Sequence, residues 1–140
     1  MRGARRKPPE RAGLALRLRI DREDGRIERQ ASGTSGGSAL LVGIDIGGTK
    51  IAVAVGDGDG AVRARRRRPT APSGRPQEDL ARLADDVRAL LGEAGVALEE
   101  VAAVGVTAPG PLDAGRGVVL QPPNLPGWSH VPIVARLGEA

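Results

Sequence analysis

The stretch LLVGIDIGGTKIAVAV, residues 40–55, constrains the fold more than any other part of the chain. Two apolar runs, residues 40–46 and 51–55, flank four residues in which two glycines are followed by a hydroxyl and an ammonium group. Apolar runs of this length, separated by a short glycine-containing turn, are typical of neighbouring strands in a hairpin. The first run is continuous apart from Asp45 near its end, which predicts a buried strand.

The turn Gly47-Gly48-Thr49-Lys50 carries chemistry that an ordinary hairpin does not need. Glycines allow positive φ and let a ligand approach the backbone, and exposed N–H groups in such a turn form a concave anion site. Thr49 and Lys50 can donate hydrogen bonds to phosphate oxygens, and Asp45 can hold a hydrated Mg²⁺ ion beside them. A plain hairpin is the alternative, but this spacing favours a cradle for the polyphosphate of a nucleotide. It matches neither a Walker loop nor a dinucleotide-binding glycine turn, because a strand follows.

Residues 76–93 predict a helix, since apolar residues recur there at helical spacing. Pro76 suits the first turn, Glu78 and Asp79 lie near the positive end of the helix dipole, and Gly95 stands where a left-handed cap is common.

The other elements complete an alternating pattern of strands and helices. The arginine-rich run 61–68 predicts a strand nearer the edge of the sheet, ended by Pro69, and a turn-rich loop is expected over 109–117. Further strands are expected over 101–106 and 118–120, and a helix over 131–139, with Ser129 as its cap and Pro132 in its first turn. This order predicts an α/β fold with a mixed sheet.

Composition excludes several classes of protein. The chain has 140 residues, no cysteine, and Trp128 as its single aromatic side chain among Phe, Trp and Tyr, so disulfides and thiolate metal sites are excluded. The net charge of +4 comes from the first 30 residues, where ten Lys and Arg outnumber five acidic residues, and the remainder carries −1. A nucleic-acid-binding surface on the main part of the chain is therefore not expected. No apolar run approaches the ~20 residues of a membrane span, and the basic N-terminus lacks the apolar segment of a secretory signal, so we expect a cytoplasmic protein.

Residues 1–38 differ in composition from the rest and are predicted to form a basic, disordered extension that ends in a flexible linker. Within it, LALRLRIDREDGRIERQ alternates apolar and charged residues and could pair as a small hairpin. A basic arm for nucleic acid is the alternative, which the absence of aromatic residues for base stacking disfavours. We therefore place the folded unit in residues 39–140.

Two motifs resemble known proteins. GIDIGGTKIAVAV, residues 43–55, is similar to the first phosphate motif of the superfamily that contains sugar kinases, hexokinases and actin-like ATPases. Residues 101–128 resemble the ROK family of bacterial sugar kinases and sugar-responsive repressors, since a Pro-Gly-Pro loop is followed by GVV and then PNLPGW. Together the motifs imply the N-terminal lobe of an actin-like ATPase (ribonuclease H-like) fold, an α/β lobe with a mixed sheet and flanking helices, in truncated form.

The resemblance implies an ATP-dependent kinase for a glucose-like hexose, with ATP and Mg²⁺ as cofactors. Asp45 would position the magnesium ion, and the phosphates of ATP would be lined by Gly48, Thr49 and Lys50. Gly110 and Asn124 would lie at the sugar. Such residues suit that role, because an amide offers a donor and an acceptor to a hydroxyl and a glycine lets the ring approach the backbone. A turn residue that bonds its own backbone is the alternative for Asn124.

The resemblance also indicates what this chain lacks. The family's catalytic aspartate belongs to an Asn-Asp motif on the next strand, which this sequence does not reach, and Asp113 is not that residue. No catalytic residue is assigned, and we expect an N-terminal fragment that is inactive by itself. A sugar-responsive repressor and a non-catalytic nucleotide- or sugar-binding domain are the alternatives. The intact Asp-x-Gly-Gly-Thr-Lys pattern favours the kinase, and full-length members of the family imply a homo-oligomer.

Three other features carry weaker signals. The only histidine, His130, has no cysteine partners and is not expected to bind a metal ion. Asp57 and Asp59 lack the closing glutamate of a calcium loop and predict a hairpin turn instead. The arginines of RARRRR alternate faces on a strand, so we expect them to protect a sheet edge rather than to bind nucleic acid.

Overall fold

The structure is a computed structural model, and it describes residues 38–139. The predicted disordered extension, with its hairpin, its linker and the alternative of a basic arm, lies outside the described residues except at Ser38. The division of the chain into residues 1–38 and 39–140 therefore stays a prediction.

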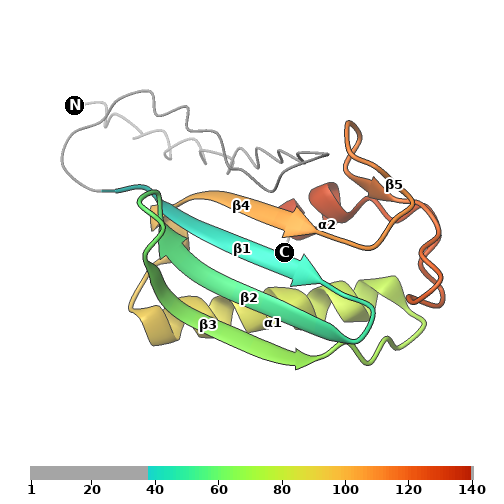
Figure 1. Cartoon of the computed structure of the whole chain (residues 1–140), viewed down its shortest axis with the longest axis horizontal. Helices are drawn as coiled ribbons and strands as arrows, with labels where there is room; N and C mark the ends of the chain where they lie inside the picture. Colours follow the sequence, from blue (N-terminus) through green and yellow to red (C-terminus); the bar gives the residue numbers. More distant parts are fainter. Residues whose placement is uncertain (1–37, 140) are drawn as a thin grey trace, which may run out of the picture.

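A four-stranded mixed sheet with the strand order β3-β2-β1-β4 forms the frame of the molecule (Figure 1). β2 pairs antiparallel with both β1 and β3, whereas β4 runs parallel to β1. The parallel pair requires a crossover, which α1 and the short 3₁₀ helix η1 provide. The bounds of these elements are β1 (Leu40–Ile46), β2 (Lys50–Asp57), β3 (Val62–Pro69), α1 (Pro76–Ala94), η1 (Leu98–Glu100) and β4 (Val101–Thr107).

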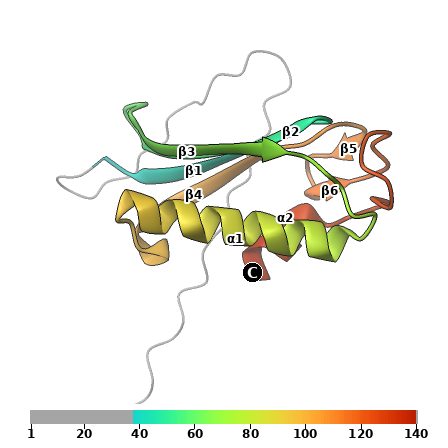
Figure 2. The ribbon, with the colours of Figure 1, turned by 90° about the horizontal axis from the view of Figure 1, so that it is seen from below.

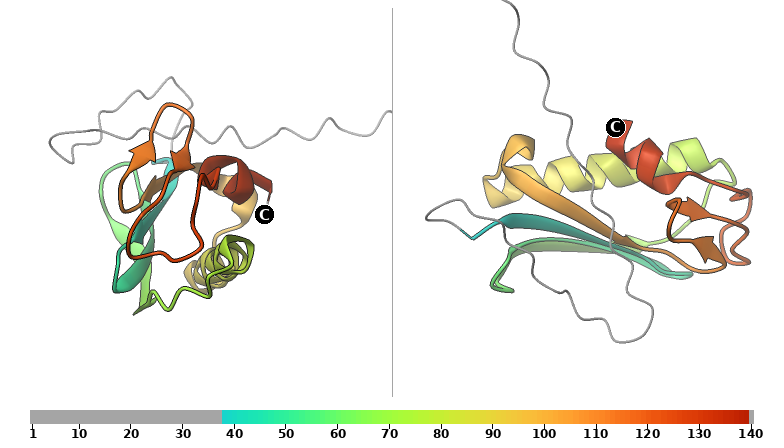
Figure 3. Two further views of the ribbon diagram at one scale, coloured as in Figure 1. Left: turned by 90° about the vertical axis from the view of Figure 1, so that its right-hand side faces the viewer. Right: turned by 90° about the horizontal axis from the view of Figure 1, so that it is seen from above.

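A smaller part of the structure follows β4. β5 (Leu112–Asp113) and β6 (Val118–Val119) form a short antiparallel pair, and α2 (Ile133–Glu139) closes the described chain. Figures 2 and 3 show α1 and α2 on the same face of the large sheet, with the β5–β6 hairpin beyond the end at which β1 meets β2. No helix within residues 38–139 combines the length and the apolar character that crossing a bilayer requires.

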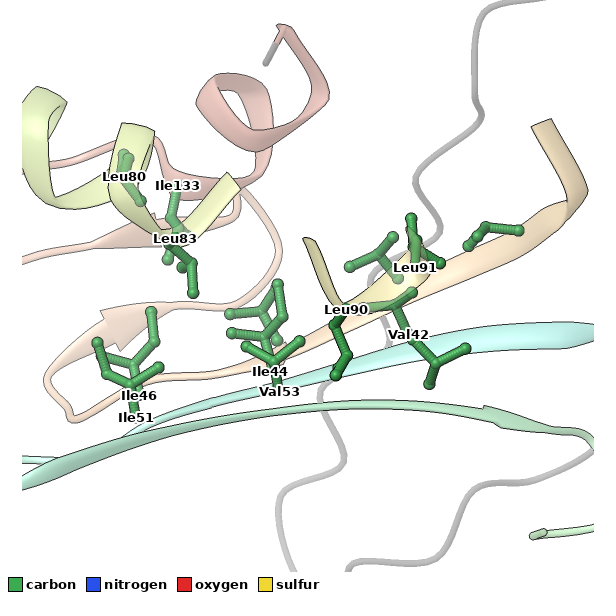
Figure 4. Packing of buried hydrophobic residues seen from close by; sticks show 14 of the residues in the cluster. Val42, Ile44, Ile46, Ile51, Val53, Leu80, Leu83, Leu90, Leu91 and Ile133 are labelled. Atoms are coloured by element: carbon green, nitrogen blue, oxygen red, sulfur yellow. The ribbon is translucent and has the colours of Figure 1, made fainter. Parts of the chain in front are cut away.

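The hydrophobic core lies between the sheet and these helices. Figure 4 shows Val42 and Ile44 of β1 pointing toward Leu83 and Leu90 of α1. Leu83 is 1% exposed and Leu90 is fully buried. The core is almost entirely aliphatic, with Trp128 as its one aromatic side chain.

The strand of residues 40–46 is buried on one face only, which corrects the prediction of a buried strand. Leu40, Val42, Ile44 and Ile46 face the helices, whereas Gly43 and Asp45 are exposed. The apolar run looks nearly continuous because the open face contributes Leu41 and Gly43, with Asp45 as its only charged residue. A single covered face is therefore enough to explain it.

The boundaries at several elements also differ from expectation. The helix predicted over 131–139 begins at Ile133, and the Arg136 N–H donates to the Pro132 carbonyl at 3.0 Å, so Ser129 is not its cap. Leu112–Asp113 forms β5 inside the predicted loop. Pro69 is the last residue of β3 and not the residue after it. By contrast, Gly95 caps α1 in the left-handed region with φ 65°, as predicted.

The arginine-rich strand lies at an edge of the sheet, as predicted. Arg66 and Arg68 form ion pairs with Asp86 of α1, and Arg66 also pairs with Glu93. These contacts tie the edge strand to the helix, and the other arginines of the strand are exposed.

Replacing Leu90 with Ala should lower the free energy of unfolding by about 2–5 kcal/mol, because the substitution leaves a cavity at a fully buried position between helix and sheet. Urea unfolding followed by far-UV circular dichroism would measure the change. Leu98→Ala is the matched control, since Leu98 is 45% exposed and its truncation should cost less than about 0.5 kcal/mol. Equal effects of the two substitutions would contradict this packing.

Candidate functional site

The turn between β1 and β2 has no room for a side chain on either glycine. A Cβ atom on Gly47 would lie 2.8 Å from the Lys50 carbonyl oxygen, and one on Gly48 would lie 2.8 Å from Asn124 Nδ2. Neither glycine has a φ in the left-handed region, so the expectation that positive φ explains them is wrong. Close approach of neighbouring atoms requires these glycines instead.

Thr70 holds the turn from behind. Its N–H donates to the Thr49 carbonyl at 3.0 Å, and its hydroxyl donates to the Gly47 carbonyl at 2.7 Å. Thr70 is 5% exposed and is the one buried polar residue in the described part of the chain. On the opposite side, the N–H groups of Gly48 and Thr49 make no hydrogen bond within residues 38–139, and both residues are exposed. The turn thus presents two open amide donors on a fixed backbone.

Asp45 lies on the open face of the sheet, close to the end of β1. Thr107 of β4 donates from its hydroxyl to Asp45 Oδ1 at 2.6 Å, because the parallel pairing places the two residues opposite each other. The neighbours of Asp45 on this face are Gly43 on its own strand and Ala52 on β2, neither of which crowds the carboxylate. Lys50 alternates with buried Ile51 and therefore shares this face.

The described residues contain no cluster of three His, Cys, Asp or Glu side chains that could hold a metal ion by themselves. Magnesium commonly keeps several waters and is bound through one or two carboxylates together with substrate phosphates. One exposed carboxylate next to open amide donors fits that arrangement. It does not fit a metal site that is independent of a nucleotide.

Asp57 closes the β2–β3 hairpin, as the sequence predicted. Its Oδ1 atom accepts hydrogen bonds from the N–H groups of Asp59 and Ala61, at 3.1 and 3.0 Å. This turn geometry accounts for the GDGDG stretch without a calcium ion.

The loop over 122–128 reaches the β1–β2 turn. The Asn124 side chain occupies the space beside Gly48, with its Nδ2, Cβ and Cγ atoms within 3.2 Å of the position of a Gly48 Cβ. Gly110 is exposed and lies three residues past the end of β4, with no heavy atom within 4 Å of its own Cβ position. The structure thus brings Asn124 against the turn and leaves open space at Gly110.

Asp79, in the first turn of α1, connects three segments through its carboxylate. Oδ1 accepts from the Ser73 N–H at 2.9 Å, Oδ2 accepts from the Trp128 indole N–H at 3.1 Å, and Arg82 lies 3.5 Å from Oδ1. Burial alone raises the pKa of Asp79, but the hydrogen bonds from Ser73 and Trp128 and the charge of Arg82 outweigh it and lower the pKa below its ordinary value.

Sequence reasoning missed Thr70, Thr107 and the bonding role of Asp79. Thr70 directly follows Pro69, the partner of Lys50 in the β2–β3 ladder, so extending that ladder by one step would have placed it at the turn. The hydrogen bond from Thr107 to Asp45 can be predicted only when the pairing of β1 with β4 is known. The position of Asp79 in the first helical turn indicated an interaction with the helix dipole and not its hydrogen bonds with Ser73 and Trp128.

Comparisons with known proteins identify the family. The model of the ROK family matches residues 41–140, and the chain belongs to that family. It is 38% identical over 96 residues to an N-acetylmannosamine kinase of Escherichia coli O157:H7, and 29% identical over 99 residues to a glucokinase of Thermotoga maritima. A ROK family glucokinase from Streptomyces griseus, solved in complex with glucose and AMPPNP, superposes with a TM-score of 0.54 at 33% identity.

These relatives are much longer than the matched region. The matches cover 69–71% of this chain but 30–31% of the two kinases, and 30% of the Streptomyces griseus structure. The resemblance to ROK sugar kinases and the α/β actin-like ATPase fold with a mixed sheet are thereby confirmed.

Replacing Thr70 with Val should lower the free energy of unfolding by about 1–3 kcal/mol, because the Gly47 carbonyl loses its buried donor. Thr70→Ser keeps the hydroxyl and should recover most of that loss. Thr49→Val, at an exposed position in the same turn, should change stability by less than about 0.5 kcal/mol. Urea titrations of the three variants would measure these differences, and a Thr70→Val variant as stable as the parent would argue against the role of Thr70.

Asp79→Asn should lower the free energy of unfolding at neutral pH by about 1.5–3 kcal/mol, since charge-assisted hydrogen bonds are lost. The pKa of Asp79 is depressed in the folded protein, so its stabilisation is complete above the unfolded pKa of about 3.9 and disappears as pH falls through the folded pKa. The difference between parent and variant should therefore be constant near neutrality and shrink in acid. Unfolding curves between neutral and strongly acidic pH test this, with Glu78→Gln as the control.

Proposed function

We propose that this chain supplies the phosphate-binding hairpin and part of the sugar site of an ATP-dependent kinase that acts on a glucose-like hexose. The contact between Asn124 and Gly48 carries the proposal. Phosphate transfer to a sugar requires the sugar hydroxyl and the terminal phosphate to be neighbours. The residues assigned separately to sugar and to phosphate are in contact, although 76 positions separate them in the sequence.

Each group of the site has a role in this proposal. The open N–H groups of Gly48 and Thr49, with Gly47 holding the turn tight, would bind phosphate oxygens of ATP, and the Lys50 ammonium would neutralise their charge. Bound ATP would supply the phosphoryl group. Asp45, oriented by the Thr107 hydroxyl, would bind waters of the Mg²⁺ ion that accompanies the nucleotide.

The sugar would lie on the side of Asn124 that faces away from Gly48. The exposed amide of Asn124 can donate to one sugar hydroxyl and accept from another. Gly110 leaves open space in which a sugar ring could approach the backbone. The relatives are named for glucose and for N-acetylmannosamine, so these two sugars are the first ones to test.

We further propose that the isolated chain binds its ligands without transferring phosphate. Phosphoryl transfer depends on groups that surround the reacting phosphate, and this chain spans about 30% of its kinase relatives. The catalytic base that the family resemblance implies is not among its residues. We also propose a cytoplasmic location, on the sequence grounds given above, and a homo-oligomer for full-length members of the family.

Isothermal titration calorimetry of the chain with MgATP, and with each of the two sugars, tests the proposal. Lys50→Gln should weaken MgATP binding by about tenfold, the effect of losing one charged hydrogen bond, and leave sugar binding within about twofold. Asn124→Ala should weaken sugar binding by a similar factor.

Arg88→Gln is the control for charge, because Arg88 lies on α1 and pairs only with Asp85 among the described residues. It should leave both affinities unchanged. No saturable binding of MgATP or of either sugar would contradict the proposed function, and so would equal losses in Lys50→Gln and Arg88→Gln.

A further inference from the structure

A closed series of contacts connects the β1–β2 turn over 47–50, the phosphate turn, with the loop over 122–128, the sugar loop. Thr70 bonds the turn, and the connection after it leads within three residues to Ser73, whose N–H donates to Asp79. Asp79 accepts from Trp128, which ends the loop that carries Asn124. Asn124 then lies against Gly48 of the turn.

The connection over 70–75 and the sugar loop, called the two loops below, also pack backbone to backbone. Gly127 has a φ of 81°, and a Cβ atom added to it would lie 2.0 Å from the Gly74 carbonyl oxygen. Leu125 and Trp128 anchor the sugar loop in the core, with exposures of 2% and 4%. Within residues 38–139, the Asp79 carboxylate is the one side-chain group that bonds both loops, since Oδ1 accepts from Ser73 and Oδ2 accepts from Trp128.

We propose that Asp79 is a positioning residue, which holds the sugar loop over 122–128 against the phosphate turn and so fixes the place of Asn124 beside Gly48. The consequence for ligands rests on the proposed function, but the mechanical coupling does not. Asp79 is 13% exposed at its side chain and lines a shallow pocket with Ile46, Thr70 and Trp128, beneath the turn. It acts on substrate only through the loop.

A residue that merely stabilises the helix would behave differently. Acidic groups in the first turn of α1 stabilise the helix by interacting with the positive end of its dipole, and both Glu78 and Asp79 lie there. Glu78 pairs with Arg75 next to the helix start, and within residues 38–139 it forms no hydrogen bond or ion pair with Ser73 or with the loop over 122–128. Glu78→Gln is therefore a matched control that removes one charge from the same helical turn.

Amide hydrogen exchange of the full chain tests the coupling without any ligand. The Leu125 and Trp128 N–H groups bond within the sugar loop, at 3.3 and 3.1 Å, so their exchange reports loop opening. In Asp79→Asn they should exchange about tenfold faster, beyond any change shared by the amides of β1. In Glu78→Gln they should exchange within about twofold of the parent.

Trp128→Phe provides a second variant. It keeps an aromatic ring at position 128 and the hydrogen bond from Ser73 to Asp79, but it removes the indole N–H that donates to Asp79. It should reproduce the faster loop exchange and weaken binding of glucose or N-acetylmannosamine by about tenfold, with MgATP affinity within about twofold. Faster exchange that is uniform over loop and strands, or no change in loop exchange in both variants, would overturn the proposal. If the parent chain binds no sugar, the proposed function fails while the exchange measurement still decides the role of Asp79.

Discussion

The tight fit of Asn124 against Gly48 is the constraint on which the candidate site depends. A residue with any side chain at position 48 would push the asparagine away, and a residue with any side chain at 47 would collide with the carbonyl of Lys50. The same two glycines leave amide donors uncovered toward solvent. One steric requirement therefore produces both the tight turn with its open amides and the proximity of that turn to the Asn124 side chain, without a left-handed backbone conformation at either glycine.

The one-sided sheet explains why this chemistry can be concentrated at one place. The helices cover the face that carries the aliphatic core (Figures 2 and 3), so the hydrophobic packing uses side chains other than those assigned to nucleotide or sugar. The other face carries Gly43, Ala52 and Gly105 around Asp45, all of them small. The Asp45 carboxylate on this face is exposed, which the proposed water-mediated contact with a divalent cation would require. Scaffold and site are thus assigned to alternate residues of the same strands.

The sequence predicted the main elements well, because its signals there are local. The helical spacing over 76–93 placed α1 to within one residue, and the left-handed cap at Gly95 followed from glycine chemistry. Contacts between residues that are far apart in the sequence could not be predicted from such local signals. Thr107 orients Asp45 only because β1 and β4 pair in parallel. Asp79 has an adequate local explanation at the helix start, which concealed its bond to Trp128, 49 positions away.

The two edges of the sheet differ in chemistry, and this has a consequence for assembly. β3 carries five arginines and ends in a proline, which lacks an N–H group, so it resists pairing with another strand. β4 forms the opposite edge with the sequence VAAVGVT, which contains no charge. Among the described residues, the charges and the proline that disfavour edge-to-edge pairing are therefore confined to β3, and β4 has neither.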